Sequence, residues 1–242
     1  MSERESSQRE RGATGAGRSE LARTGLSEER EESFRGFPER ALIFFEGLEA
    51  DNSKPYWTDH KDSYERDVRD PVLALLAELE GEFGAGKIFR PYRDVRFSKD
   101  KTPYKTNVVA WVDGFYLSLS ADGLFLGGGL YRPAPDQLDR LRRAVADDVQ
   151  GAALSRVASE LTAAGFEVGG DTMTRAPRGY PADHPRLSLL KHRSLVASRH
   201  WEPAPWLHTR AAFGRVRDSW RAVVPLNEWL RTNVGASDLP LR

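Results

Sequence analysis

Apolar residues recur at helical spacing in the segment that begins at Phe34. Pro38 suits the first turn of a helix, because the N–H that proline lacks has no partner there anyway. The residues after it carry an apolar stripe with a period of three to four. This stripe comprises Ala41, Leu42, Phe44, Phe45 and Leu48. The polar cluster at 51–53 is typical of a helix end, so we predict a helix that begins at Pro38 and ends there.

A second helical stretch is predicted from about Pro55 to Phe83. Proline inside a helix removes one hydrogen bond and clashes with the preceding turn. Pro71 is therefore expected to divide this stretch and to begin a new helix. The apolar stripe of the second part comprises Val72, Leu75, Leu76 and Leu79. Gly84 and Gly86 end the pattern.

The middle of the chain has the character of β-structure. β-Branched and aromatic residues lie between turn signals, and they predict strands at 88–97, 106–112, 115–120 and 124–131. The dipeptides Asp113-Gly114 and Asp122-Gly123 favour tight hairpin turns. We therefore expect an antiparallel meander of about four or more strands.

Helical patterns return after the predicted meander. They cover 135–149 and 152–164, followed by an irregular stretch to about 190, a strand at 194–198 and a helical end at 205–233 with a break near Pro225. Because helices and strands fall into separate blocks, the predicted fold class is α+β. The meander is expected to pack against the N-terminal and C-terminal helices.

The first 33 residues differ from the rest of the chain. They are rich in Ser, Gly, Glu and Arg, and Leu21 and Leu26 are almost their only large apolar side chains. Such a segment cannot bury enough surface to offset its ordering entropy. We expect a disordered tail at 1–33, a single domain at 34–234 and a flexible C-terminus at 235–242. A weak amphipathic turn between the two leucines is a candidate partner-binding peptide.

The composition excludes several classes of protein. Lys plus Arg and Asp plus Glu both number 36, and this balance argues against coating nucleic acid by bulk charge. The chain has no Cys, so a disulfide scaffold, a thiolate nucleophile and an iron–sulfur cluster are excluded. No apolar run resembles a signal peptide or a membrane span. A cytoplasmic location and no membrane partner are expected.

The densest polar chemistry lies at residues 90–105, where six basic side chains and two carboxylates occur. Alternate residues of a strand point to opposite faces. One face would hold Phe89, Pro91, Arg93, Val95 and Phe97. The other would hold Arg90, Tyr92, Asp94 and Arg96. Arg93 would lie on the apolar face, so we expect it to pair with a carboxylate, because an unpaired buried charge is costly.

The second face of this predicted strand places two Arg around one Asp. Guanidinium groups donate in pairs to phosphate or carboxylate oxygens, so this face predicts an anion site in which Asp94 orients the two guanidinium groups. The predicted ligand contacts here are Arg90, Arg93, Arg96, Lys101, Tyr104 and Lys105. Two interpretations stay open, because the same Arg and Asp side chains can also simply lock strands together.

This region resembles the signature of a known family. Its pattern is Arg90-x-x-Arg93-Asp94-x-Arg96-Phe97-x-x-Asp100-Lys101-x-x-Tyr104. The pattern is similar to that of DUF2461, a bacterial and fungal family of unknown function, and the likeness extends from Phe34 to Val234. The resemblance implies a shared fold and no established activity. It therefore leaves the reaction and any cofactor unassigned.

Several residues outside this motif are further candidates. Trp57, His60 and Tyr64 share one helix face, where they would either line a pocket that stacks a ring or pack against the core. Trp57 and His60 are thus predicted ligand contacts. Gly127-Gly128-Gly129 predicts the close approach of a ligand, of another backbone or of the Trp57 helix.

Proton transfer has three candidate residues, Asp94, Asp100 and His184. His184 follows a carboxylate and precedes a proline that fixes its backbone, so it is a candidate general base, or else a loop His bonded to backbone. The spacings typical of metal ligands are missing from the sequence, so no metal site is predicted.

These observations support two hypotheses. The first is a domain, possibly an enzyme, that binds a phosphate- or carboxylate-bearing small molecule or nucleotide. The alternative is a non-enzymatic module that binds protein or nucleic acid, with the Arg/Asp motif mainly structural. Nucleic acid is a possible partner that the neutral total charge does not favour.

Overall fold

The computed structural model describes residues 33–96 and 99–240. These residues belong to one compact unit, which spans 32–242. The predicted tail with Leu21 and Leu26, and Phe97 of the first predicted strand, lie outside the described residues. The helices are α1 (Glu39–Ala50), α2 (Lys54–Ser63), α3 (Asp70–Phe83), α4 (Pro135–Ala146), α5 (Asp148–Ala163), α6 (Leu187–Leu190) and α7 (Ala211–Asn233). The strands are β1 (Lys87–Ile88), β2 (Asn107–Val112), β3 (Phe115–Ser120), β4 (Gly123–Leu130), β5 (Glu167–Gly169) and β6 (Leu195–Trp201).

The strands form one antiparallel sheet in the order β1-β2-β3-β4-β6-β5. The predicted α+β class and the antiparallel meander are confirmed. Asp113 and Gly114 make the turn from β2 to β3 with φ angles of 33° and 87°, which is the left-handed region that Gly favours. This predicted Asp-Gly turn therefore joins neighbouring strands, whereas the turn from β3 to β4 is made by Ala121 and Asp122, and Gly123 is the first paired residue of β4.

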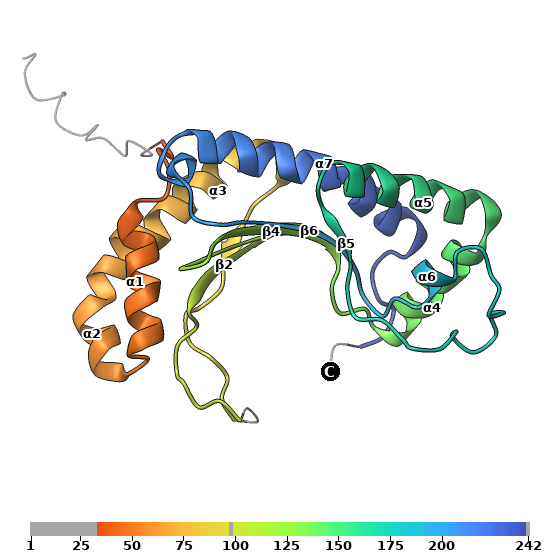
Figure 1. The fold of residues 1–242 in the computed structure, drawn as a ribbon, viewed down its shortest axis with the longest axis horizontal. Helices are drawn as coiled ribbons and strands as arrows, with labels where there is room; N and C mark the ends of the chain where they lie inside the picture. The colour runs from red at the N-terminus through yellow and green to blue at the C-terminus, as the bar shows by residue number, and fades with distance from the viewer. Residues whose placement is uncertain (1–32, 97–98, 241–242) are drawn as a thin grey trace, which may run out of the picture. The chain divides into compact units, whose positions relative to one another are not determined.

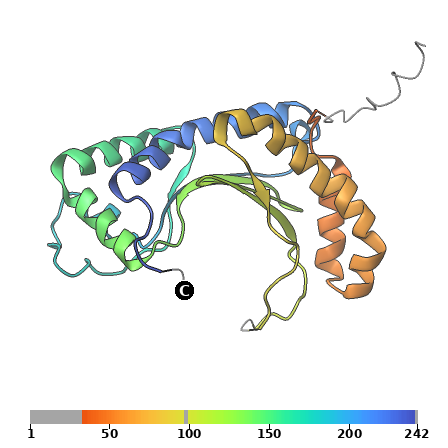
Figure 2. The same ribbon diagram turned by 180° about the vertical axis from the view of Figure 1, so that it is seen from behind.

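One face of the sheet is buried against helices. Alternate residues of the central strands, such as Val108, Leu117 and Leu126, are almost fully shielded from solvent. Figures 1 and 2 show the sheet as curved, with α7 running along its convex side. A Cβ atom added to Gly128 would lie 2.9 Å from Val223 Cγ1 of α7. The close approach expected at the three consecutive glycines is thus to α7 and neighbouring backbone, rather than to the Trp57 helix.

The prediction of a strand over 88–97 was wrong in its extent. Regular pairing covers only β1, and an isolated bridge follows between Tyr92 and Tyr104. From the pair Ile88–Ala110 to the pair Tyr92–Tyr104, one chain advances by four residues and the other by six. This mismatch interrupts the ladder, because a regular antiparallel pair advances equally on both sides.

Neither of the two prolines that were predicted to break a helix, Pro71 and Pro225, interrupts the helical chain. Pro71 lies in the first turn of α3, but a π-helical segment, Tyr64–Arg69, joins α2 to α3 without a gap. The N–H of Asp70 bonds to Glu65 O, so the hydrogen-bond register has shifted just before the residue that lacks an N–H. Pro225 lies inside α7, which continues through it. Burial of Val223 and Leu226 on either side offsets the lost hydrogen bond.

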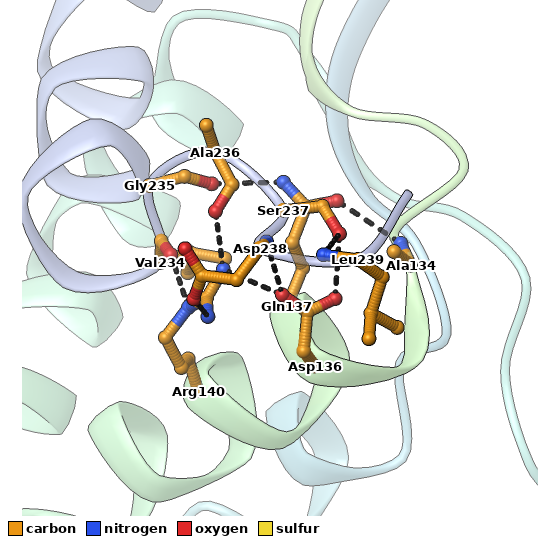
Figure 3. A network of polar contacts seen from close by, with 10 residues as sticks. All are labelled: Ala134, Asp136, Gln137, Arg140, Val234, Gly235, Ala236, Ser237, Asp238 and Leu239. Carbon is orange, nitrogen blue, oxygen red and sulfur yellow. Dashed lines mark hydrogen bonds and ion pairs between the residues drawn. The ribbon is translucent and has the colours of Figure 1, made fainter. Parts of the chain in front are cut away.

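The C-terminal segment 234–239 lies against α4 and bonds to it (Figure 3). The Arg140 guanidinium donates to Val234 O at 2.5 Å and to the Ala236 carbonyl, and it forms ion pairs with Asp136 at 3.1 Å and Asp238 at 2.9 Å. Asp136 also accepts the Ser237 hydroxyl at 2.8 Å. Arg140 therefore links α4 to the end of α7. Mobility of 235–242 stays a prediction.

We expect Arg140→Ala to lower the free energy of unfolding by about 2 kcal/mol, because the part-buried bond to Val234 O and the part-buried ion pair with Asp136 are lost. Urea unfolding followed by circular dichroism measures this loss. The matched control is Arg156→Ala, since Arg156 is exposed and pairs with Glu160 at 3.9 Å, and its loss should change the free energy of unfolding by less than about 0.5 kcal/mol. Equal losses in the two variants would contradict the assigned role of Arg140.

Candidate functional site

An irregular hairpin, which we call the arm, extends from the β1–β2 edge of the sheet (Figure 1). Its described residues are 89–96 and 99–105. Arg93 N donates to Pro103 O at 2.9 Å, and Lys105 N donates to Pro91 O at 2.8 Å. These two hydrogen bonds flank the Tyr92–Tyr104 bridge. The arm is therefore extended and two-stranded although most of it lacks a regular ladder.

The base of the arm is fastened to the helices. Asn52 donates from Nδ2 to Tyr104 O at 3.1 Å and accepts from Tyr104 N at 3.0 Å through Oδ1. The Tyr104 ring stacks on Trp57 with centroids 4.5 Å apart and an angle of 9°. Both rings are buried. Tyr104 and Trp57, two predicted ligand contacts, thus meet each other in the core, and the bonds of Asn52 to Tyr104 are a contact that the sequence did not indicate.

Three of the predicted cations bond within the arm. Arg96 pairs with Asp94 at 2.7 Å, and Arg93 bonds the Asp100 carboxylate and the Thr102 hydroxyl. The ammonium of Lys101 donates to Val95 O at 2.9 Å. The expected carboxylate partner of Arg93 is therefore Asp100. The Arg93 side chain is 34 % exposed, so this pair is formed at the surface rather than in the core.

These contacts hold both candidate carboxylates in the ionised form. The Arg96 side chain, helped by the Arg96 N–H, lowers the pKa of Asp94 to about 2. The N–H and hydroxyl of Thr102, with Arg93, lower the pKa of Asp100 to about 2. A carboxylate with so low a pKa is a weak base near neutral pH. Proton transfer by either residue stays a prediction.

The two predicted histidines bond to backbone atoms of neighbouring residues. His60 is exposed and stacks on Tyr56 at 4.0 Å, with Nδ1 bonded to Tyr56 O at 2.8 Å. It therefore turns away from the buried Trp57 on the same helix. His184 Nδ1 accepts the Arg186 N–H at 3.1 Å, so its described bond is to backbone. Its role as a general base stays a prediction.

Arg90 and Lys105 belong to a cluster of cations at the base of the arm. The Nζ atoms of Lys105 and Lys87 lie 5.6 Å and 5.5 Å from the centre of the Phe89 ring, and Lys87 Nζ lies 5.2 Å from that of Trp111. Among the described residues, no carboxylate forms an ion pair with Lys87, Arg90 or Lys105. Burial and the nearby Arg90 charge lower the pKa of Lys105. The charge of Arg90 also helps to lower the pKa of Asp94, so the cluster is a concentration of positive charge with a carboxylate nearby but no ion pair to one among the described residues.

This cation cluster borders the open face of the sheet. Lys87 pairs with Trp111, and Trp111 with Tyr116, so these side chains project from the same face. The next row of that face holds Val109, Ser118, Phe125 and His200. A hollow of about 750 Å³ lies over the second row. Its size falls within the range of small-molecule sites.

The floor of this hollow combines rings with hydrogen-bonding groups. Tyr116 and Phe125 stack at 5.3 Å, and burial raises the pKa of Tyr116 to about 12. Asn107 Nδ2 donates to the Ser118 hydroxyl at 2.8 Å. The His200 Nε2 atom lies 2.9 Å from Asp122 O. These polar contacts suit binding and orientation of a ligand.

Sequence reasoning missed most residues of the hollow. Asn107, Ser118 and Ser120 lie in strands that were predicted, and their alternation with apolar residues was a signal for an exposed polar face. No comparable signal placed Lys87 or His200 beside them, since that placement depends on the order of strands. In the described part of the chain, no group of three His, Asp or Glu side chains is arranged to hold a metal ion.

The two arm carboxylates are expected to respond differently when their Arg partners are removed. Arg96→Ala should return the pKa of Asp94 most of the way to its ordinary 3.8, because the Arg96 bond is the largest cause of the shift. Arg93→Ala should raise the pKa of Asp100 less, since the Thr102 bonds remain. Carboxyl ¹³C NMR titration measures both values, and equal rises would contradict this assignment.

The lowered pKa values of Asp94 and Asp100 also determine how the stability of the folded state depends on pH. A carboxyl group whose pKa is lower in the folded than in the unfolded chain stabilises the folded state above about pH 4. That contribution is lost as the pH falls toward 2. In the Arg96→Ala variant, the free energy of unfolding should therefore fall less between neutral and acidic solution than it does in the wild-type protein. The effect should be small because the Asp94–Arg96 pair is exposed.

Comparisons with known proteins give one match. The model of the family described as conserved hypothetical protein (DUF2461) matches residues 40–229. Neither the curated proteins nor the solved structures include a match to the chain. No helix in the described ranges is both long enough and apolar enough to cross a membrane. The matched residues span α1 to the last turns of α7 and include the arm, and the chain belongs to the DUF2461 family.

Proposed function

We propose that this protein binds a small molecule carrying a phosphate or carboxylate group, which docks at the base of the arm. The observation that carries the proposal is the gathering of Lys87 and Lys105 around Phe89, with Arg90 close enough to act on Lys105 and with no ion pair to a carboxylate among the described residues. Cations held near one another repel, and an anion placed among them relieves that repulsion. The lowered pKa of Lys105 is a consequence of burial and of the nearby Arg90 charge.

The body of the ligand would lie in the hollow next to the cluster. Phe89 and Trp111 are each about two-fifths exposed, at 41 % and 40 %, so both offer ring surface to a bound molecule. The arm is stabilised by the bonds that Arg93, Arg96 and Lys101 make within it. These bonds hold the arm beside the bound ligand. The hollow and the exposed rings favour a small molecule, including a nucleotide, as the ligand.

The protein should bind inorganic phosphate, ATP or citrate with a measurable rise in melting temperature, because a ligand that binds only the folded state stabilises it. Lys105→Met and Arg90→Met should each weaken binding about tenfold, the loss expected for one charge-assisted hydrogen bond. Isothermal titration calorimetry measures the affinities. Lys61→Met is the matched control, since Lys61 is exposed on α2. No binding of any of the three anions, or equal loss in the control, would refute the proposal.

One observation favours the alternative of an interaction module. Arg93 and Arg96 are neutralised within the arm, as a mainly structural motif would be, and the arm extends away from the sheet (Figure 1). If the arm binds single-stranded nucleic acid, affinity should fall steeply between low and physiological salt, because binding releases counterions. Fluorescence anisotropy with labelled RNA and DNA tests this, and weak binding that does not change with salt concentration excludes the nucleic-acid form of the alternative.

A further inference from the structure

The hollow over the open face of the sheet has a floor of two stacked rings. Tyr116 and Phe125 lie 5.3 Å apart with an angle of 28° between their planes. A Cβ atom on Gly127 would lie 2.8 Å from Tyr116 Cε1, so the Tyr116 ring can lie across this strand only because Gly127 has no side chain. Both rings line the hollow and are only partly buried. The floor therefore offers an aromatic surface on which a flat ring can stack.

On one side of Phe125 the hollow is lined by an amide with an unused oxygen. Phe125 pairs with Ser118 of β3, and the Ser118 hydroxyl accepts a hydrogen bond from Asn107 Nδ2 at 2.8 Å. This bond uses the nitrogen of the amide, so its acceptor, Asn107 Oδ1, remains. Oδ1 forms no hydrogen bond with another described residue. An acceptor without a protein donor is thus left on this side of the floor.

On the other side of Phe125 the hollow is lined by a histidine whose tautomer is fixed. Phe125 pairs there with His200 of β6, and His200 Nε2 lies 2.9 Å from the Asp122 carbonyl oxygen. A carbonyl oxygen only accepts, so Nε2 carries the hydrogen and Nδ1 of the neutral ring is an acceptor. No described residue donates to His200 Nδ1. The floor therefore has an unused acceptor on each side.

The rest of the described lining adds acceptors rather than cations. Its charged residues are Asp122 and Glu202, whose carboxylates also accept, and none of the described lining residues is Lys or Arg. The hydroxyls of Tyr116, Ser118 and Ser120 can donate or accept. Apart from the second N–H of the Asn107 amide, every free group of fixed role is thus an acceptor. A ligand that brought only carbonyl oxygens to these groups would leave both sets of acceptors unpaired.

We propose that the hollow binds a flat heteroaromatic ring that carries amino groups, of the aminopurine or aminopyrimidine class. The ring stacks on Tyr116 and Phe125, and its amino N–H groups donate to Asn107 Oδ1 and His200 Nδ1. This binding mode rests on the proposed function only in placing the body of the ligand in the hollow. The cation cluster takes no part in it, so probes without a phosphate or carboxylate group test it.

The experiment compares purine riboside, adenosine and 2,6-diaminopurine riboside by NMR titration. The three ribosides share the ring and the sugar and carry no, one and two amino groups. Each amino group should lower the dissociation constant about fivefold, the gain expected of one net hydrogen bond. The backbone amide signals that shift on binding should include those of Ser118 and Phe125, because these residues lie at the floor of the hollow.

Two variants separate the amino contacts from stacking. The double variant Asn107→Leu, His200→Phe lacks both acceptors and should bind the three ribosides with equal affinity. Phe125→Leu is the matched comparison, because it removes ring surface but no acceptor, and it should weaken binding of all three ribosides alike by about fivefold. Circular dichroism spectra and melting temperatures establish that the variants are folded.

The outcomes distinguish this binding mode from the anion site. Equal affinities of the three ribosides for the wild-type protein would overturn the amino-bearing ring, and so would a gain that persists in the double variant. Failure of all three to bind, or signal shifts away from the floor, would overturn the ring site as well. Binding of inorganic phosphate in a separate titration then shows that the anion site stands. Loss of phosphate binding with the riboside series as expected refutes the anion site alone.

Discussion

Burial of one face of the curved sheet is the constraint on which the rest of the structure depends. Leu117 and Leu126 are fully shielded, and Trp220 of α7 is buried over the same strands. Strand side chains alternate strictly, so burying one set sends the other to the opposite face. That second set contains Asn107, Ser118 and His200, which are polar. The open face is therefore a consequence of where the core lies, and the hollow follows from it.

Where sequence signals were local, the fold was predicted well. Pro38 marked the start of α1, and the two Asp-Gly dipeptides marked turns of the meander, because each feature depends on a few adjacent residues. The miss at Pro225 has the opposite cause. Burial along both halves of α7 outweighs one absent hydrogen bond, and that burial is known only once the sheet is in place. The strand β5 was missed because its three residues are held by long-range pairing to β6.

The candidate site was only partly predicted, again because some of its contacts depend on long-range pairing. The sequence located the concentration of charge at 90–105, but it did not show which cations would be compensated. Arg96 and Asp94 are two residues apart and pair on one side of the arm, whereas Arg90 and Lys105 come together only when the hairpin closes. Lys87 joins them through its register with Trp111. Asn52, which fixes Tyr104, contributes through a contact between segments 52 residues apart.

The family pattern gains a physical explanation from this arrangement. Of its residues, Arg93, Asp94, Arg96, Asp100 and Tyr104 make the contacts that shape the arm or fasten it to the helices. Asp94 and Asp100 pair with the Arg96 and Arg93 guanidinium groups along the arm, whereas among the described residues no carboxylate forms an ion pair with Lys87, Arg90 or Lys105 at its base. A chain with no net charge can in this way hold a local excess of positive charge at the base of the arm. The chemistry of the site then depends on the geometry of the arm, since a shift in the arm would move Lys105 and Arg90 together.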